Sequence, residues 1–144
     1  DQWCRDNIAQ DFPEIRTQVS GLLQIESELQ EIVQLVGSDA LPVDQQLTLE
    51  VARMIREYFL QQNGFHEVDA YCDINLQYKM AKAILSFQES AKSAMASGAQ
   101  LNDVVNVQSR TDLMRGRFEK GYIDDIDDMV KKMTAEIADT VEGN

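Results

Sequence analysis

Residues 13–62 read PEIRTQVSGLLQIESELQEIVQLVGSDALPVDQQLTLEVARMIREYFLQQ and hold two apolar stripes separated by a short turn. In the first half, apolar residues recur every three or four positions, the spacing that places side chains on one face of an α-helix. They are Ile15, Val19, Leu22, Ile25, Leu29, Ile32 and Val36. Pro13 suits a first helical turn, with Asp11 as a candidate cap, and Gly37 suits a helix end because it tolerates left-handed geometry. The pattern predicts a helix from Pro13 to about Val36.

The second half predicts another helix, which begins after Pro42 and ends at Asn63-Gly64. Its apolar stripe consists of Leu47, Val51, Met54, Ile55, Tyr58 and Phe59. The connection between the two helices, Ser38 to Leu41, is short, and a short connection makes consecutive helices antiparallel neighbours. The stretch therefore predicts a long helix-turn-helix pair.

The chain after this pair also has helical spacing. A third helix is expected from Asp73 to Ser97-Gly98, with its stripe at Leu76, Met80, Ile84, Phe87, Ala91 and either Ala94 or Met95. Short helical turns are expected at 101–107 and 111–118. A last helix should start near Ile123 and bury Ile126, Met129 or Val130, Met133 and Ile137. With no strand pattern and no internal repeat, the fold class is predicted to be all-α, an antiparallel helical bundle.

Length and charge limit the class of protein. The 144 residues argue for a single domain over 1–144, with a well-defined bundle in 1–98 and a less regular helical tail in 99–144. Lys plus Arg number 13 and Asp plus Glu 25, a net charge of −12 that opposes binding to nucleic acids and to anionic membranes. No signal peptide and no apolar run long enough for a membrane span is present, so direct membrane insertion is not expected. Because the chain starts with Asp1, we expect either a processed protein or, as the favoured interpretation, a piece of a longer protein.

The sequence contains few residues in patterns that indicate catalysis or metal binding. The sequence has no phosphate-binding loop, no dinucleotide-binding glycine motif, no nucleophile elbow and no zinc-protease motif, so neither a catalytic nor a metal site is expected. The single histidine, His66, is interpreted as a surface or capping residue. Cys4 and Cys72 lack a redox spacing and are interpreted as free thiols in a reducing compartment. The acidic run of Asp124, Asp125, Asp127 and Asp128 lacks the order of a calcium loop and favours a solvated helix start.

Two segments have both a structural and a functional interpretation. Phe65 follows Gln61-Gln62-Asn63-Gly64 at a helix end, where an aromatic ring can stack on a purine; composition alone favours a ring that fills the end of the bundle. Residues 37–42 (GSDALP) are either a plain connector or a projecting contact element. Periodicity does not choose between the two interpretations of GSDALP.

The residues themselves point to a known family. Within 28–72, ELQEIVQLVG, LEVARMIREYFLQQN and the following F-H-x-V-D-x-Y-C resemble the C-terminal domain of the catalytic A subunit of archaeal-type and vacuolar-type rotary ATPases. Trp3, Phe12-Pro13-Glu14 and residues 77–91 (QYKMAKAILSFQESA) also match that pattern. The resemblance covers most of residues 1–95. It is weaker after Gly98, where Val-Asn-Val-Gln-Ser-Arg at 105–110 replaces the family's Leu-Pro-Val-Arg-like segment.

The resemblance implies a nucleotide-related role for the helix end. It aligns Phe65 with the aromatic residue that packs against adenine, and Gln62, Asn63 and Gly64 with the same edge of the pocket. Relatives often have Ala at the position of Gly64, a small change. The phosphate-binding loop and catalytic glutamate would lie in an upstream nucleotide-binding domain, so ATP or ADP with Mg would bind the parent subunit, no catalytic residue is expected here, and this chain alone is expected to be inactive.

The resemblance also implies a mechanical role. It aligns the tip residues Gly37, Ser38, Asp39, Ala40, Leu41 and Pro42 with a helix-turn-helix that faces the central rotor stalk and transmits torque. Further implied partners are the upstream domain and the non-catalytic B subunits of a hexameric ring, in the cytoplasmic peripheral sector of a membrane-bound complex that couples ATP synthesis or hydrolysis to ion transport. The alternative hypothesis is a free-standing acidic helical module that binds a protein and has no nucleotide role.

Overall fold

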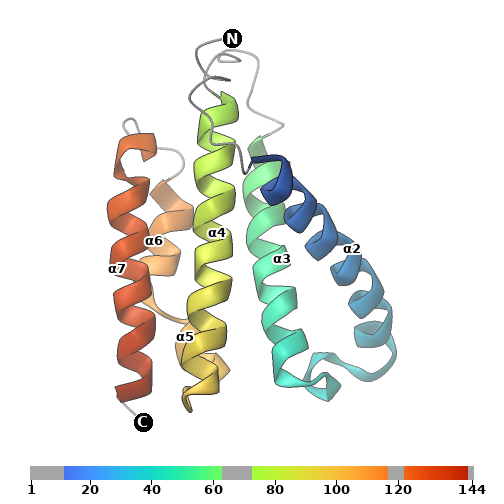
Figure 1. The fold of residues 1–144 in the computed structure, drawn as a ribbon. Helices are drawn as coiled ribbons and strands as arrows, with labels where there is room; N and C mark the ends of the chain where they lie inside the picture. Colours follow the sequence, from blue (N-terminus) through green and yellow to red (C-terminus); the bar gives the residue numbers. More distant parts are fainter. Residues whose placement is uncertain (1–11, 63–72, 117–121, 143–144) are drawn as a thin grey trace.

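The chain is described by a computed structural model that covers residues 12–62, 73–116 and 122–142 (Figure 1). These residues form six α-helices and one 3-10 turn, and no strand occurs among them. The elements are α2 (Phe12–Val36), η1 (Ser38–Ala40), α3 (Val43–Gln62), α4 (Asp73–Ala96), α5 (Leu101–Val105), α6 (Gln108–Gly116) and α7 (Tyr122–Glu142). The all-α class and the long helix-turn-helix pair predicted from the sequence are confirmed.

The helices α3, α4 and α7 run side by side, and α2 leans against this row (Figure 1). α4 occupies the centre and contacts α2, α3, α5 and α7. α2 and α3 form an antiparallel hairpin joined through η1, and α2 diverges from α3 toward that turn (Figure 1). α5 and α6 connect α4 to α7, and α6 packs on α7.

The core is built from the stripes of α3, α4 and α7, with Leu113 added from α6. Its largest fully buried side chains are Tyr58, Phe87, Leu47, Met54, Ile55, Met80, Ile84, Leu113, Ile126, Met133, Ile137 and Val51. The stripes predicted for α3, α4 and α7 are confirmed at the positions whose side chains are described, because residues three and four apart on each helix face its neighbours. The side chains of Phe59 and Leu76, two further members of these stripes, lie outside that description.

The stripe predicted for α2 is only partly correct. Ile15, Leu22 and Leu29 are buried, but Ile25 and Ile32 are each 44% exposed and Val36 is 61% exposed. The reason is tertiary: because α2 diverges from α3 (Figure 1), only one edge of its apolar face meets another helix. A charged residue, Glu26, is instead 4% exposed on the inner side of α2.

The tail consists of α5, α6 and α7 within the described residues. α6 begins at Gln108, ahead of the expected 111, and α5 ends at Val105. The early start of α6 has a visible cause, because the Ser109 backbone N–H donates to Glu136 Oε1 of α7 at 2.8 Å. A carboxylate at a helix N-terminus satisfies a free N–H group and opposes the helix dipole. This cap comes from a residue 27 positions away, so no local pattern reveals it.

Candidate functional site: the tip of the helical hairpin

The residues predicted to line an adenine pocket are almost entirely outside the described part of the chain. Gln62 is the last residue of α3. Asn63, Gly64 and Phe65 lie outside the described residues, as do His66, Cys4 and Cys72. The adenine role therefore stays a prediction.

The tip, residues 37–42, is an ordered turn. Gly37 has φ +87°, a value that strains other residues, and its N–H donates to Val33 O at 2.8 Å to complete α2. The Leu41 N–H donates to Ser38 O at 3.1 Å, and Gln46 Nε2 donates to Leu41 O at 2.9 Å. Backbone and side-chain hydrogen bonds thus fix the path of the turn.

Within the tip, a single apolar side chain is buried. Leu41 is 6% exposed and anchors the turn. The other tip residues, Gly37, Ser38, Asp39, Ala40 and Pro42, are exposed. The tip is therefore an exposed turn held by one buried side chain, and the contact-element interpretation of GSDALP stays a prediction.

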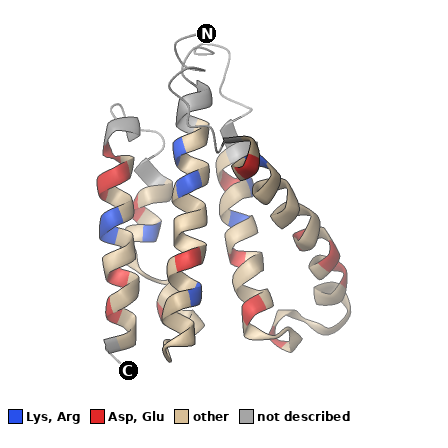
Figure 2. Ribbon diagram, viewed as in Figure 1, with Lys and Arg blue, Asp and Glu red and all other residues tan. Residues whose placement is uncertain are grey.

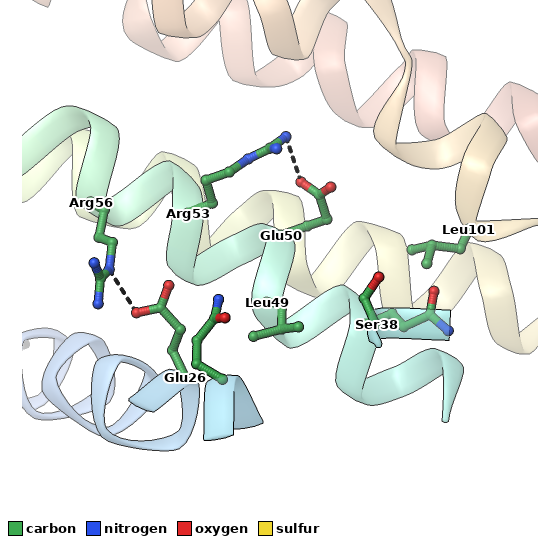
Figure 3. Close-up of a pocket in the computed structure, with 9 residues that line it drawn as sticks. Glu26, Ser38, Leu49, Glu50, Arg53, Arg56 and Leu101 are labelled. Carbon is green, nitrogen blue, oxygen red and sulfur yellow. Dashed lines mark hydrogen bonds and ion pairs between the residues drawn. The ribbon is translucent and has the colours of Figure 1, made fainter. Parts of the chain in front are cut away.

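An ion pair ties the two arms of the hairpin together behind the tip. Arg56 Nε of α3 donates to Glu26 Oε1 of α2 at 2.7 Å (Figure 3). The Glu26 side chain is 5% exposed and the Arg56 side chain 52% exposed. A buried carboxylate is costly without a partner, so Glu26 constrains α2 to remain beside Arg56.

The groove between α2 and α3 is polar, and each of its arginines is paired with a glutamate. It has a volume of about 430 Å³ and is lined by Glu26, Gln30, Ser38, Gln46, Leu49, Glu50, Arg53, Arg56 and Leu101 (Figure 3). Both of its arginines are paired: Arg56 with Glu26, and Arg53 with Glu50 at 2.9 Å. The arrangement suits a structural link between helices better than an anion-binding site.

A second polar anchor joins the tail to the hairpin. Arg110 of α6 donates through Nη2 to Glu50 Oε2 and through Nη1 to Val105 O, both at 2.9 Å. Its guanidinium also lies 5.1 Å from the centre of the Phe87 ring, within the range of a cation–π contact. Burial lowers the pKa of Arg110, and the Glu50 charge opposes that shift. Sequence reasoning missed this anchor because its partners are distant along the chain.

The hairpin carries charge of one sign. Residues 17–52 contain six acidic residues and no lysine or arginine. In Figure 2 the tip half of α2 and α3 accordingly shows red and no blue. This half of the hairpin presents a negative field to any approaching molecule.

The acidic run at the start of α7 behaves as a solvated helix end. Asp125, Asp127 and Asp128 are exposed, and Lys79 Nζ lies 3.7 Å from Asp127 Oδ2. No group of three or more His, Cys, Asp or Glu side chains within the described ranges is placed to hold a metal ion. Among the described helices, none combines the length and the hydrophobicity needed to cross a bilayer.

Together these features define an acidic all-α domain with a long helical hairpin. Residues 1–105 match the family model described as the C-terminal domain of V and A type ATP synthase. The chain belongs to this family.

Whole-length relatives agree with this assignment. The chain is 46% identical over 136 residues to the A subunit of the A-type ATP synthase of Methanosarcina barkeri, covering 94% of the chain and 24% of that protein. It is 43% identical over 141 residues to the V-type ATP synthase alpha chain 1 of Clostridium tetani, covering 96% and 24%. It is 44% identical over 137 residues to the A subunit of the A-type ATP synthase of Natronomonas pharaonis, covering 95% and 23%. The chain thus spans about a quarter of the length of these curated relatives.

Proposed function

We propose that the chain acts as the C-terminal helical domain of the catalytic subunit of a rotary, ion-translocating ATP synthase or ATPase, where it closes the adenine side of the nucleotide pocket and transmits torque to the central rotor stalk. The observation that carries the proposal is family membership joined to the hairpin geometry. α2 and α3 are long, they are tied by Glu26 and Arg56, and their tip is exposed. Two long helices that move as one body suit the transfer of force from a hinge to a tip.

The rest of the machine would lie outside this chain. The phosphate-binding loop, the catalytic glutamate and the Mg²⁺ ligands would belong to an upstream nucleotide-binding domain, which binds ATP or ADP. The non-catalytic B subunits would complete a hexameric ring in the cytoplasmic peripheral sector of the complex. The isolated chain would therefore not hydrolyse ATP, because phosphoryl transfer needs those phosphate and metal contacts.

The adenine role is tested by replacing Phe65 in the full-length protein. Loss of one aromatic stack costs about 1–3 kcal/mol, so Phe65→Ala is expected to weaken ADP binding by about 5- to 150-fold in calorimetric titration. Phe65→Tyr keeps the ring and is expected to keep the affinity. Equal ADP affinity of the wild-type and Phe65→Ala proteins would show that the ring does not contact the base.

The torque role is tested at Asp39, the exposed acidic residue of the tip. The experiment uses the assembled complex, in which Cys4 and Cys72 of this chain are replaced by serine and Asp39 by cysteine. A photoactivated cross-linker is attached to the new cysteine through a cleavable disulfide. Illumination is expected to join the tip to the rotor stalk and to lower ATP turnover at least about ten-fold, because a covalent link stops rotation. Cleavage of the disulfide should restore turnover.

The matched control for this experiment is Asp139→Cys, an exposed acidic position on α7. Cross-linker at Asp139 is expected to leave turnover unchanged. The proposal fails if the linker at Asp39 attaches only to proteins outside the stalk, or if it attaches to the stalk and turnover continues at its original rate.

A further inference from the structure

Arg110 of α6 contacts three other helices through one guanidinium. Its Nη2 donates to Glu50 Oε2 of α3 and its Nη1 to Val105 O of α5, each at 2.9 Å. Its Nε donates to Met54 Sδ of α3 at 3.4 Å, and its Cζ lies 5.1 Å from the centre of the Phe87 ring of α4. The Arg110 side chain is 13% exposed. One residue of the tail is therefore both packed and hydrogen-bonded against the hairpin arm α3.

This set of partners suits an arginine. A guanidinium carries five N–H donors in a fixed planar fork, so its three nitrogens serve three acceptors that lie in different directions. Val105 O belongs to the last turn of α5, where carbonyl groups have no partner within the helix. Arg110 thus completes the end of α5 with one nitrogen and binds the Glu50 carboxylate with another.

The Glu50 carboxylate is shared by two arginines that differ in what they connect. Arg53 Nη2 lies 2.9 Å from Glu50 Oε2, one turn away on the same helix (Figure 3). Arg110 reaches the same oxygen from a position 60 residues away, on α6. Of these two pairs, the one with Arg110 joins different helices. Arg53 is therefore a built-in comparison for Arg110.

Separation of α3 from α6 would be costly at this point. Burial lowers the pKa of Arg110, since the surroundings disfavour an unpaired guanidinium, and the Glu50 charge opposes that shift. If α3 tilted away, Arg110 would stay largely buried without its carboxylate. Another ion pair on α3, between Arg56 and Glu26, joins it to α2. α3 is thus held to α2 by one ion pair and to the tail by another.

The geometry points to Arg110 as a positioning residue, which fixes the angle of α3 on the tail through Glu50 and so lets the tail support the hairpin during ATP turnover. Its effect on turnover rests on the proposed function, whereas the link between α3 and α6 is a property of the chain itself. Glu50 lies about 18 Å from Gln62 along the axis of α3. The link is therefore remote from the proposed adenine contacts, and a change at Arg110 should alter the transfer of force more than the affinity for nucleotide.

The first measurement asks whether Arg110 positions α3. In the 144-residue chain, Cys4 and Cys72 are replaced by serine, and spin labels are attached to cysteines that replace the exposed Asp44 of α3 and Asp139 of α7. Double electron–electron resonance then gives the distribution of distances between the two labels. Arg110→Gln is expected to widen this distribution at least about two-fold, because α3 loses its link to α6.

The second measurement uses the full-length subunit in the assembled complex and records kcat and KM for ATP hydrolysis per assembled complex. Arg110→Gln is expected to lower kcat by about 2- to 30-fold, the range for residues that carry coupling between distant sites. KM for ATP should stay within about two-fold. A merely structural defect would reduce the amount of complex that assembles and would leave kcat per complex unchanged.

Two further variants complete the design. Arg53→Gln removes an arginine from the same carboxylate oxygen without breaking a link between helices, so the distance distribution should be unchanged and kcat should stay within about two-fold. Glu50→Gln breaks the same link from the other side, which keeps the inference testable if Arg110→Gln does not assemble. If Arg110 acts through Glu50, the double variant should have a kcat within about two-fold of that of Arg110→Gln alone.

Four results would overturn the inference. These are an unchanged distance distribution in Arg110→Gln, equal kcat values for Arg110→Gln and Arg53→Gln, a rise in KM at constant kcat, or additive effects of Arg110→Gln and Glu50→Gln. Failure of the proposed function gives a different result, in which cross-linking at Asp39 and Phe65→Ala change nothing while Arg110→Gln still widens the distance distribution. If the cross-link stops turnover and Arg110→Gln keeps the wild-type kcat, the inference alone is wrong.

Discussion

Phe87→Ala is expected to lower the free energy of unfolding by about 4 kcal/mol, within the range of about 3–5 kcal/mol for buried phenylalanines. Phe87 lies on the central helix α4 with 0% exposure, and it belongs to the core shared with α3 and α7. The truncation leaves a cavity and also removes the ring that faces the Arg110 guanidinium at 5.1 Å. For a chain of this length, the loss corresponds to a fall of about 10 °C in the midpoint of thermal unfolding.

The matched control for this variant is Phe87→Leu, which keeps most of the volume and should cost about 1 kcal/mol. Urea denaturation monitored by circular dichroism measures both variants, and the slope with urea should stay constant if only stability changes. A loss below about 1 kcal/mol for Phe87→Ala would mean that α4 does not occupy the centre of the core.

How far the fold follows from the sequence is clearest at α2, α3 and α4. In α3 and α4, helices pack on more than one side, so a spacing of three and four residues is enough to predict which residues are buried. In α2 the same spacing includes Ile25 and Ile32, which remain half-exposed. The spacing describes an amphipathic helix, but the angle at which α2 leans on α3 decides how much of its apolar face is covered.

The candidate sites also contain features that could be predicted from the sequence and features that could not. The turn at Gly37 and the exposure of the tip could be predicted, because Gly and Pro set local backbone geometry. The anchors Glu26, Arg110 and Glu136 could not, since their partners Arg56, Glu50 and Ser109 lie 27 to 60 residues away. The adenine role of Phe65 came from the family resemblance, and it remains a prediction.

Arg56→Met is expected to lower the free energy of unfolding by about 3 kcal/mol. Glu26 would keep its buried position but lose the cation that donates to it at 2.7 Å, and removing one partner of a buried pair costs about 3–5 kcal/mol. We take the low end because the Arg56 side chain is 52% exposed, so water can reach its place. Arg53→Met is the matched control on the same helix; its partners Glu50 and Glu57 are more exposed than Glu26, and the expected cost is below about 1 kcal/mol.

The double variant Glu26→Leu/Arg56→Met shows whether Arg56 stabilises the fold by neutralising Glu26 or by packing of its own side chain. With both charges gone, no carboxylate is left buried, so stability should return to within about 1 kcal/mol of wild type in urea denaturation. Recovery means that Arg56 matters because it neutralises Glu26, and that the pair constrains how α2 sits on α3 rather than adding net stability. If the double variant is as unstable as Arg56→Met, the loss comes from packing of the Arg56 side chain instead.

A hairpin with apolar contacts in place of the ion pair would allow α2 to slide along α3, because apolar contact is not directional. The double variant should therefore be nearly as stable as wild type, and under the proposed torque role it should lower ATP turnover in the assembled complex.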